Sequence, residues 1–166
     1  MILIKRLVQK FIWAILPSGP LGDRARGVSY HFLLSQAGSN FKMGEHSFIY
    51  SPEKLIVGNN VYIGFSSYLG NGSIYLEDEV LIGNHVSITP ANHISKNGSY
   101  RFGGSELNEI RIGFGTWIGA HSCIVAGVTI GSNCLVAAGS VVTKNFGDNK
   151  IIGGVPAKVL VDNINE

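Results

Sequence analysis

The chain has 166 residues, of which 45% are hydrophobic and 14% are charged, with 22 glycines and a formal net charge of +2 at pH 7. This length suits a single domain, and so small a net charge, without any basic run, argues against a nucleic-acid-binding protein. The two cysteines, Cys123 and Cys134, have no metal-ligand spacing, and they predict a reduced, cytoplasmic protein rather than a disulfide framework.

The first segment, residues 1–16, is apolar but carries three basic residues, Lys5, Arg6 and Lys10. It is too short and too charged to cross a bilayer, which takes about 20 apolar residues. Its large apolar residues recur at helical spacing: Ile4, Leu7, Val8, Phe11, Ile12 and Ile15. Two interpretations stay open. The predicted helix packs on its own protein, or it makes a peripheral contact in the interface of the inner membrane.

A second helix is predicted after the first. Pro17-Ser-Gly-Pro20 ends the first helix, and Leu21–Gln36 has the length and composition of another. Residues 1–40 are therefore expected to form an N-terminal helical segment, residues 41–161 the main domain, and residues 162–166 a short tail.

Aliphatic residues recur at every sixth position in two blocks of the main domain. The first block runs from Val57 to Ile88, with one extra residue after Leu69. The positions in the second block are Ile112, Ile118, Ile124, Ile130, Val136 and Val142. A period of six fits neither a helix nor a flat strand, and it predicts an all-β solenoid, a parallel β-helix whose coils stack on one another. The repeat stops at about residues 89–109, which predicts a loop excursion on one face, often the binding face of a solenoid.

The five histidines do not hold equivalent positions in this repeat. Three of them occupy the fourth place of a hexad, which is a corner of the coil: His46, His85 and His121. His31 falls in the predicted second helix. His93 differs, because it follows Asn92 at the mouth of the excursion, where the repeat stops. A histidine with a pKa near neutrality at such a place is a candidate general base.

Four motifs carry a family resemblance: Trp117-Ile-Gly-Ala120, Gly127-Val-Thr-Ile-Gly131, Ala138-Gly-Ser-Val-Val-Thr-Lys144 and Gly154-Val-Pro-Ala-Lys158. They resemble the hexapeptide-repeat acyltransferases, in particular the maltose/galactoside O-acetyltransferase branch and the related O-acetyltransferases of bacterial surface polysaccharides. The resemblance covers roughly Val57 to Val159. It implies a left-handed parallel β-helix, an exception to the right-handed crossover rule. It also implies a homotrimer that binds acetyl-CoA in the groove between neighbouring subunits, with no metal.

The resemblance assigns roles to particular residues. His93 matches the family's general base, and the Ala120 backbone N–H matches the donor that stabilises the tetrahedral oxyanion. The residues that match the acetyl-CoA site are Trp117, Ala138, Gly139, Thr143, Lys144 and Lys158. On the acceptor side the candidates are Ser66, Asn92, Tyr100 and Arg101, and Ser66 departs from the family pattern, which has asparagine there. Three carboxylates are candidates to orient the His93 ring: Glu106, Glu109 and Asp78.

The expected function is acetyl-CoA-dependent O-acetylation of a sugar hydroxyl, in an O-antigen, capsule or exopolysaccharide. One alternative is N-acetylation of an amino-sugar nucleotide with the same fold and base. Another is a non-catalytic or metal-binding β-helix, as in the gamma-type carbonic anhydrases, although the histidine spacing disfavours a three-histidine site. The expected location is the cytoplasm, with possible contact to the inner membrane.

Overall fold

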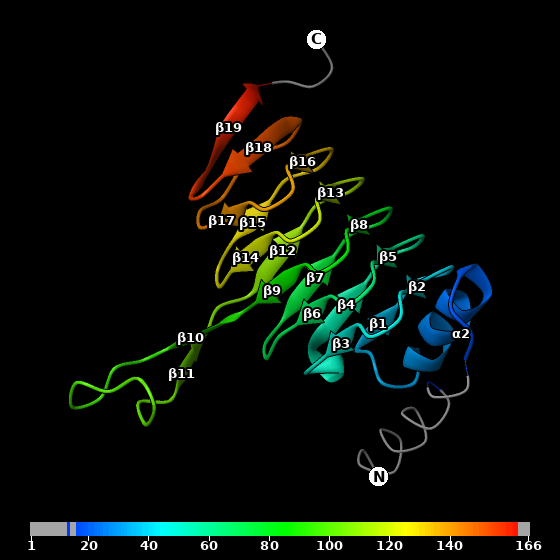
Figure 1. Ribbon diagram of the computed structural model, residues 1–166, viewed down its shortest axis with the longest axis horizontal. Helices are drawn as coiled ribbons and strands as arrows, with labels where there is room; N and C mark the ends of the chain where they lie inside the picture. Colours follow the sequence, from blue (N-terminus) through cyan, green and yellow to red (C-terminus); the bar gives the residue numbers. More distant parts are fainter. Residues whose placement is uncertain (1–12, 14–15, 163–166) are drawn as a thin grey trace.

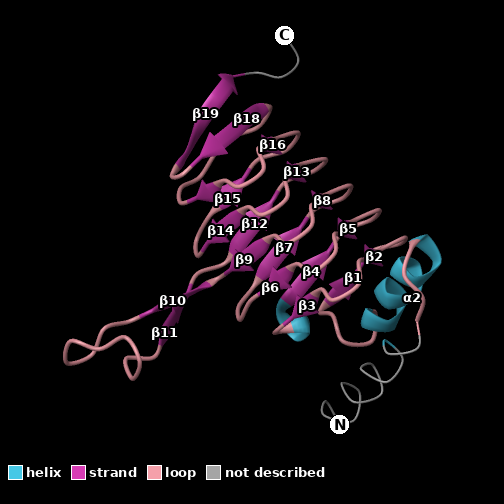
Figure 2. Cartoon of the chain, in the orientation of Figure 1, coloured by secondary structure: helices cyan, strands magenta, loops and turns pink. Residues whose placement is uncertain are grey.

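The chain winds into a triangular prism of three sheets, whose strands are parallel except for the last strand of sheet B (Figures 1 and 2). The computed structural model describes residue 13 and residues 16–162. Sheet A consists of β1 (Gln36–Ala37), β4 (Leu55–Val57), β7 (Ile74–Leu76), β12 (Ile110–Ile112) and β15 (Thr129–Ile130). Sheet B consists of β2 (Lys42–Met43), β5 (Tyr62–Ile63), β8 (Leu81–Ile82), β13 (Trp117–Ile118), β16 (Leu135–Val136), β18 (Lys150–Gly154) and β19 (Ala157–Asp162). Sheet C consists of β3 (Phe48–Ile49), β6 (Tyr68–Leu69), β9 (Ser87–Thr89), β14 (Cys123–Val125) and β17 (Val141–Val142).

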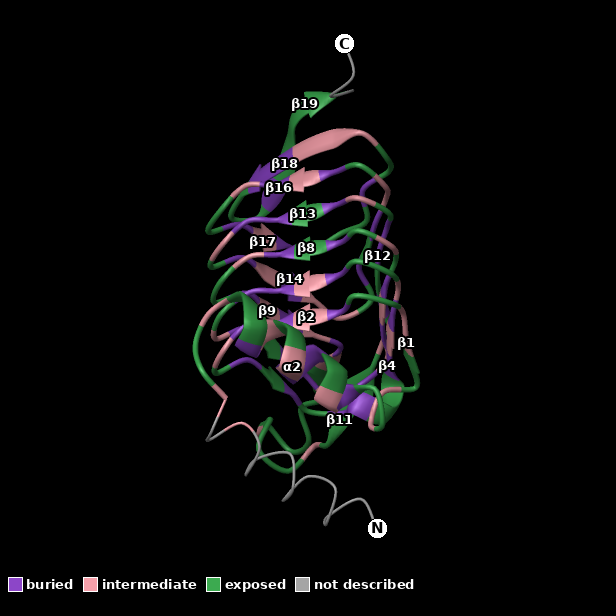
Figure 3. Ribbon diagram, turned by 90° about the vertical axis from the view of Figure 1, so that its right-hand side faces the viewer, coloured by how far each residue is buried: buried purple, intermediate pink, exposed green. Residues whose placement is uncertain are grey.

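The six-residue repeat places one aliphatic side chain of each strand inside the prism. In register, Ile112 pairs with Leu76 on one side and Ile130 on the other. All six positions of the second block are at most 1% exposed, and buried segments recur from coil to coil along the prism in Figure 3. Each such side chain contributes about 1.5–3 kcal/mol through burial. The predicted solenoid and its inward positions are confirmed.

The corners of the prism require tight backbone turns. His46, His85 and His121 have φ values of 60°, 57° and 60°, so the three predicted corner histidines do lie at corners. Asn, Asp and His tolerate this left-handed conformation better than most residues. Two residues before each of these histidines the coils approach closely, and a Cβ added to Gly119 would lie 2.6 Å from the Ala138 nitrogen.

Buried serine and threonine hydroxyl groups hydrogen-bond backbone carbonyls inside the prism. Thr116 donates its hydroxyl to the Gly131 carbonyl at 2.7 Å, and Ser67 donates to the Gly83 carbonyl at 2.8 Å. A buried hydroxyl needs such a partner, which explains why the repeat accepts serine or threonine at these positions. Cys134 takes the equivalent inward place in its coil and is buried, as the repeat predicts.

One helix covers the N-terminal end of the prism. This helix, α2 (Pro20–Tyr30), is shorter than the expected Leu21–Gln36, because β1 already pairs with β4 at residue 36. The solenoid therefore begins inside the range expected to be helical. The predicted first helix, residues 1–16, lies almost wholly outside the described residues.

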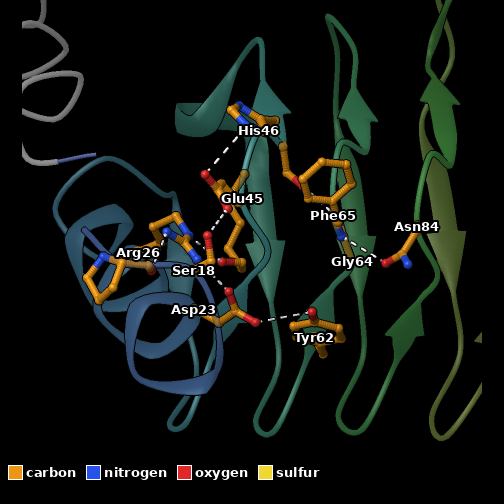
Figure 4. A network of polar contacts seen from close by, with 12 residues as sticks. Ser18, Asp23, Arg26, Glu45, His46, Tyr62, Gly64, Phe65 and Asn84 are labelled. Carbon is orange, nitrogen blue, oxygen red and sulfur yellow. Dashed lines mark hydrogen bonds and ion pairs between the residues drawn. The ribbon is translucent and has the colours of Figure 1, made fainter. Parts of the chain in front are cut away.

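Arg26 attaches α2 to the first coil (Figure 4). Its side chain is buried, donates to the Met43 carbonyl at 3.0 Å and pairs with Asp23 at 2.5 Å. Asp23 in turn accepts the Tyr62 hydroxyl at 3.2 Å, and burial together with this carboxylate raises the pKa of Tyr62. These bonds fix which face of α2 meets the prism.

The expected excursion forms an arm, a two-stranded antiparallel hairpin that extends away from the prism (Figure 1). Its strands are β10 (Ala91–His93) and β11 (Ser105–Leu107). A second hairpin, β18 with β19, closes the C-terminal end, and a short 3-10 helix, η1 (Pro52–Lys54), lies before β4.

Candidate functional site

His93 lies at the end of β10, at the base of the arm. It pairs through the backbone register with Ser105, and Asn92 pairs with Glu106. Both Asn92 and His93 are exposed. No hydrogen-bond or ion-pair partner of the His93 side chain is found among residues 16–162. The imidazole is therefore open to a substrate.

The three candidate orienting carboxylates do not hold His93 within one chain. Glu109 binds Arg111 at 2.8 Å. Asp78 accepts the Asn59 backbone N–H at 2.8 Å, which holds the pKa of Asp78 below its usual value. Glu106 lies beside Asn92 on the arm. Glu109 and Asp78 thus have other partners, and no contact joins Glu106 to His93 in the described chain.

Ala120 lies where sheet B turns into sheet C. This B–C corner is formed, coil by coil, by Glu45-His46, Phe65-Ser66, Asn84-His85, Ala120-His121 and Ala138-Gly139. In the coils before that of Ala120, Asn84 Oδ1 accepts the Phe65 N–H at 3.0 Å (Figure 4). One coil further, the residue in the place of Asn84 is alanine.

This change leaves a row of backbone donors open. In the part of the chain that the structure describes, no group accepts the N–H of Asn84, Ala120 or Ala138. Ala138 carries no side-chain acceptor that could bind the Ala120 N–H, as Asn84 binds that of Phe65. An open N–H on a rigid turn is a ready oxyanion donor, because it needs no rearrangement to bind one.

The corner histidines form an aromatic column beside this row. The His85 and His121 rings stack with centroids 4.8 Å apart and an interplanar angle of 10°. Phe65 packs edge-on against both His85 and His46 at 5.4 Å. His85 and His121 thus form a stacked pair, and Phe65 connects this pair to His46.

The acetyl-CoA candidates fall in two places. Trp117 in β13, Ala138 and Gly139 lie on or beside the B–C corner, and the space around Gly139 is open. The turn before Lys158 lies near them, because the Gly154 N–H donates to Ser140 Oγ at 3.3 Å. Ser66, an acceptor candidate, lies on the same corner two coils before Ala120.

The remaining candidates lie at the opposite edge of sheet C, the C–A corner. Thr143 and Lys144 follow β17 there and are exposed, with the Lys144 ammonium 5.6 Å from the Phe146 ring. The arm leaves from the same edge, and Tyr100 and Arg101 lie exposed near its tip. One side of a coil, about six residues long, spans on the order of 15 Å. A single chain thus places His93 and Ala120 on different edges.

Cys123 and Cys134 belong neither to the B–C corner nor to the C–A corner. Burial raises the pKa of both the Cys123 and the Cys134 thiol. Little thiolate then exists near neutral pH, so neither thiol is prepared to act as a nucleophile. Among the described residues, no three His, Cys, Asp or Glu side chains are grouped as metal ligands.

Two features were missed from the sequence, the open row of N–H groups and the stacked His85–His121 pair. A signal existed for the first, since the hexad place held by Asn84 is held by alanine in the next two coils. The shared hexad place of His85 and His121 was a signal for the stack, but the arm separates the two histidines in the sequence.

Similarity to known proteins agrees with this architecture. Residues 109–144 match the family described as bacterial transferase hexapeptide (six repeats), and residues 54–90 match the hexapeptide repeat of succinyl-transferase. The chain is 34% identical over 131 residues to the galactoside O-acetyltransferase of Escherichia coli (strain K12). That match covers 71% of this chain and 62% of the relative, so the chain spans less than two thirds of its length.

Solved structures share the fold over nearly the whole chain. The maltose O-acetyltransferase from Clostridium difficile 630 matches with a TM-score of 0.83 at 23% identity, over 97% of this chain and 87% of that one. A galactoside acetyltransferase in complex with coenzyme A matches with a TM-score of 0.81 at 28% identity, over 97% and 81%. The expected left-handed parallel β-helix is confirmed.

The repeat matches, the fold and the motifs agree: the chain resembles the hexapeptide-repeat acyltransferase superfamily, as the sequence predicts. Within that superfamily, its similarity is to the galactoside and maltose O-acetyltransferase branch, as the four motifs predict.

Proposed function

We propose that this protein is an acetyl-CoA-dependent O-acetyltransferase that acetylates a sugar hydroxyl of a bacterial surface polysaccharide. The observation that carries the proposal is the open Ala120 N–H, in the middle of the row of open N–H groups on the rigid B–C corner. Two further findings support it: the O-acetyltransferase names of the relatives, and the coenzyme A bound by the galactoside acetyltransferase.

The reaction proceeds by direct attack. A ring nitrogen of His93 accepts the proton of the sugar hydroxyl while the hydroxyl oxygen attacks the thioester carbonyl carbon. The Ala120 N–H stabilises the resulting oxyanion. The C–S bond then breaks, and the imidazolium returns its proton to the coenzyme A thiolate. No acyl-enzyme forms, which is consistent with two cysteines of raised pKa.

The test is acetyl-CoA turnover, followed with a thiol reagent and a panel of sugar acceptors. His93→Ala should lower kcat by 10²–10⁴-fold, the usual contribution of a general base. His31→Ala, which removes an exposed histidine at the end of α2, should leave the rate unchanged. A His93→Ala rate within about threefold of wild type would refute the assignment. Faster acetylation of an amino-sugar nucleotide than of any hydroxyl would favour the N-acetyltransferase alternative.

We also propose that the protein works as a homotrimer with active sites between subunits. His93 and Ala120 lie on opposite edges of sheet C, so a neighbouring subunit can bring the two together. The outer face of sheet C carries exposed aromatic rings, including Phe48 stacked on Tyr68 at 6.1 Å. Such an apolar patch suits an interface around a three-fold axis.

This assembly predicts the effect of a charge on sheet C. Tyr68→Glu should lower the native mass from a trimer to a monomer, measured by light scattering, and should abolish turnover. Tyr75→Glu, on the outer face of sheet A, is the matched control and should keep the trimer. A monomeric wild type with full activity would contradict an intersubunit site.

The expected location is the cytoplasm, with peripheral contact to the inner membrane through residues 1–16. The described residues contain no helix long and apolar enough to cross a membrane. Support for the contact comes from the basic residues Lys5, Arg6 and Lys10 among apolar ones. The triple variant Lys5→Gln, Arg6→Gln, Lys10→Gln should bind anionic vesicles less tightly than wild type, and equal binding would refute the contact.

A further inference from the structure

The arm places one hydroxyl group directly across from the histidine at its base. In the antiparallel register of β10 and β11, His93 pairs with Ser105. The N–H that follows β10, that of Ile94, donates to the carbonyl that precedes β11, that of Gly104, at 3.1 Å. Because this bond lies beside the His93–Ser105 pair, the pair itself is a non-hydrogen-bonded one. In such a pair the opposite Cα atoms lie about 4.5 Å apart, and the side chains are at their closest.

The two faces of the arm carry different groups. Residues that pair across an antiparallel ladder share a face, and neighbours along one strand point to opposite faces. His93 and Ser105 therefore share a face, and Leu107, two residues further along β11, lies on it too. Asn92 and Glu106 pair on the other face. Within β10 and β11, Ser105 is thus the polar side chain beside His93, whereas Glu106, a candidate to orient the ring, points away from it.

A histidine that acts as a base needs its other ring nitrogen held. In a neutral imidazole one nitrogen carries a proton and the other can accept one, and the hydrogen bond made by the first decides which is which. A serine hydroxyl oxygen can accept that N–H. Nδ1 is the ring nitrogen nearer to the backbone, so a side chain as short as serine on the opposite strand reaches Nδ1 more readily than Nε2. Holding the proton on Nδ1 leaves Nε2 free to accept another.

We propose that Ser105 is a positioning residue for His93: its hydroxyl oxygen accepts the Nδ1–H, so that Nε2 takes the proton of the sugar hydroxyl. The inference rests on the proposed function, in which His93 is the general base. Among residues 16–162 no hydrogen bond joins the two side chains. Both side chains are exposed, and each turns toward the other about its own side-chain bonds, from one staggered rotamer to another. The bond therefore needs no movement of the arm backbone.

The first measurement is the tautomer of the His93 ring in the full-length protein. NMR of protein with isotopically labelled histidines reports which ring nitrogen carries the proton, and the spectrum of His93→Ala identifies the His93 signals. Wild type should carry the proton on Nδ1. Ser105→Ala should move it to Nε2 in a large share of the molecules, because no side chain of β10 or β11 then holds the Nδ1 proton. Ser105→Thr keeps a hydroxyl, at a strand position that suits threonine, and should keep the wild-type tautomer.

The second measurement separates catalysis from binding. Ser105→Ala should lower kcat about tenfold, the rate equivalent of one hydrogen bond, and leave KM for acetyl-CoA unchanged. Ser105→Thr should keep kcat near that of wild type. The matched control is Ser99→Ala, which removes another hydroxyl of the arm, one that accepts the Arg101 N–H, and should leave the His93 tautomer unchanged. Since Ser105 is exposed, both of its variants should melt at the temperature of wild type.

Three outcomes would overturn the proposal. In the first, Ser105→Ala leaves either the His93 tautomer or kcat as in wild type. In the second, Ser105→Thr loses as much kcat as Ser105→Ala, so the hydroxyl is not the group that matters. In the third, the tautomer responds to Glu106→Gln and not to Ser105→Ala, which assigns the role to the other face of the arm. Failure of the proposed function looks different: His93→Ala then retains turnover, and the tautomer measurement still decides whether Ser105 holds the ring.

Discussion

Two corners of the same prism are built from the same repeat but differ in their hydrogen bonds. At the A–B corner, side chains of successive coils cap the backbone: Asn59 accepts the Ser39 N–H, Asp78 accepts the Asn59 N–H, and Asp148 accepts the Ser132 N–H. At the B–C corner, among the residues that the structure describes, only the Phe65 N–H is capped in this way, by Asn84. In the next two coils after that of Asn84, the residue in the same place is Ala120 and then Ala138.

The difference teaches where to look for function in a solenoid. A corner that stacks Asn and Asp stabilises neighbouring coils, because each side chain satisfies a donor of the coil before it. A corner that replaces them with alanine gives up that stabilisation and keeps its N–H groups available to a ligand. Proteins tend to break local rules at functional sites, and this break coincides with the residue matched to the oxyanion donor.

The largest expected effect comes from rebuilding the missing cap. Ala138→Asn should place an amide oxygen on the Ala120 N–H, as Asn84 does for Phe65. With the oxyanion donor occupied, kcat should fall by 10²–10³-fold, while thermal stability is kept or rises. Steady-state kinetics and thermal unfolding measure the two effects.

The control for that substitution is Ala138→Leu, which has a similar size but no acceptor. It should raise KM for acetyl-CoA by crowding the site and lower kcat much less than asparagine does. Equal losses of kcat in the two variants would mean that crowding, and not capping, is responsible.

Mixing two inactive variants sharpens the same comparison. If His93 of one subunit acts with Ala120 of its neighbour, subunits carrying His93→Ala and subunits carrying Ala138→Asn form some intact sites between them. Equal random mixing restores about one quarter of wild-type activity. No recovery after refolding the mixture would place both residues in the site of a single chain.

The six-residue repeat is enough to predict much of the fold, but it predicts less of the candidate site. The inward positions, such as Ile118, and the corner positions, such as His85, depend only on phase within a coil, so they could be predicted. The state of the Ala120 N–H depends on which side chain the next coil places above it, which requires the stacking register. The orientation of α2 was hidden for a similar reason. Leu21 and Val28 have the spacing of a buried face, yet both are exposed. The face that packs on the prism is instead the one with Arg26 and Gly27.

The aromatic residues beside the two corners offer the next test. Trp117, leading to the B–C corner, is 46% exposed, and Phe114, on the A–B corner, is 48% exposed. Trp117→Ala should raise KM for acetyl-CoA about tenfold, as expected for the loss of one well-packed aromatic contact. Phe114→Ala should leave KM unchanged. Similar shifts in both variants would remove the distinction between a ligand-binding corner and a structural one.

Removing a cap from the A–B corner should affect stability alone. Asn59 accepts both the backbone N–H and the hydroxyl of Ser39, each at 2.9 Å. Asn59→Ala should therefore lower the free energy of unfolding by about 1 kcal/mol, measured by denaturant titration, without changing kcat. A fall in kcat instead, at unchanged stability, would assign the A–B corner a role in the reaction.

The smallest effect is a pH dependence at Asp78 on the same corner. The backbone N–H and side-chain amide of Asn59 lower the pKa of Asp78 from its ordinary value of 3.8. A lowered carboxyl pKa stabilises the folded state above the ordinary value, and the benefit is lost as pH falls through the folded-state pKa. Wild type should thus melt higher than Asp78→Asn at neutral pH, and the two melting temperatures should converge only in acid below the ordinary pKa. A melting-temperature difference that persists unchanged in strong acid would show that the charge of Asp78 does not stabilise the A–B corner.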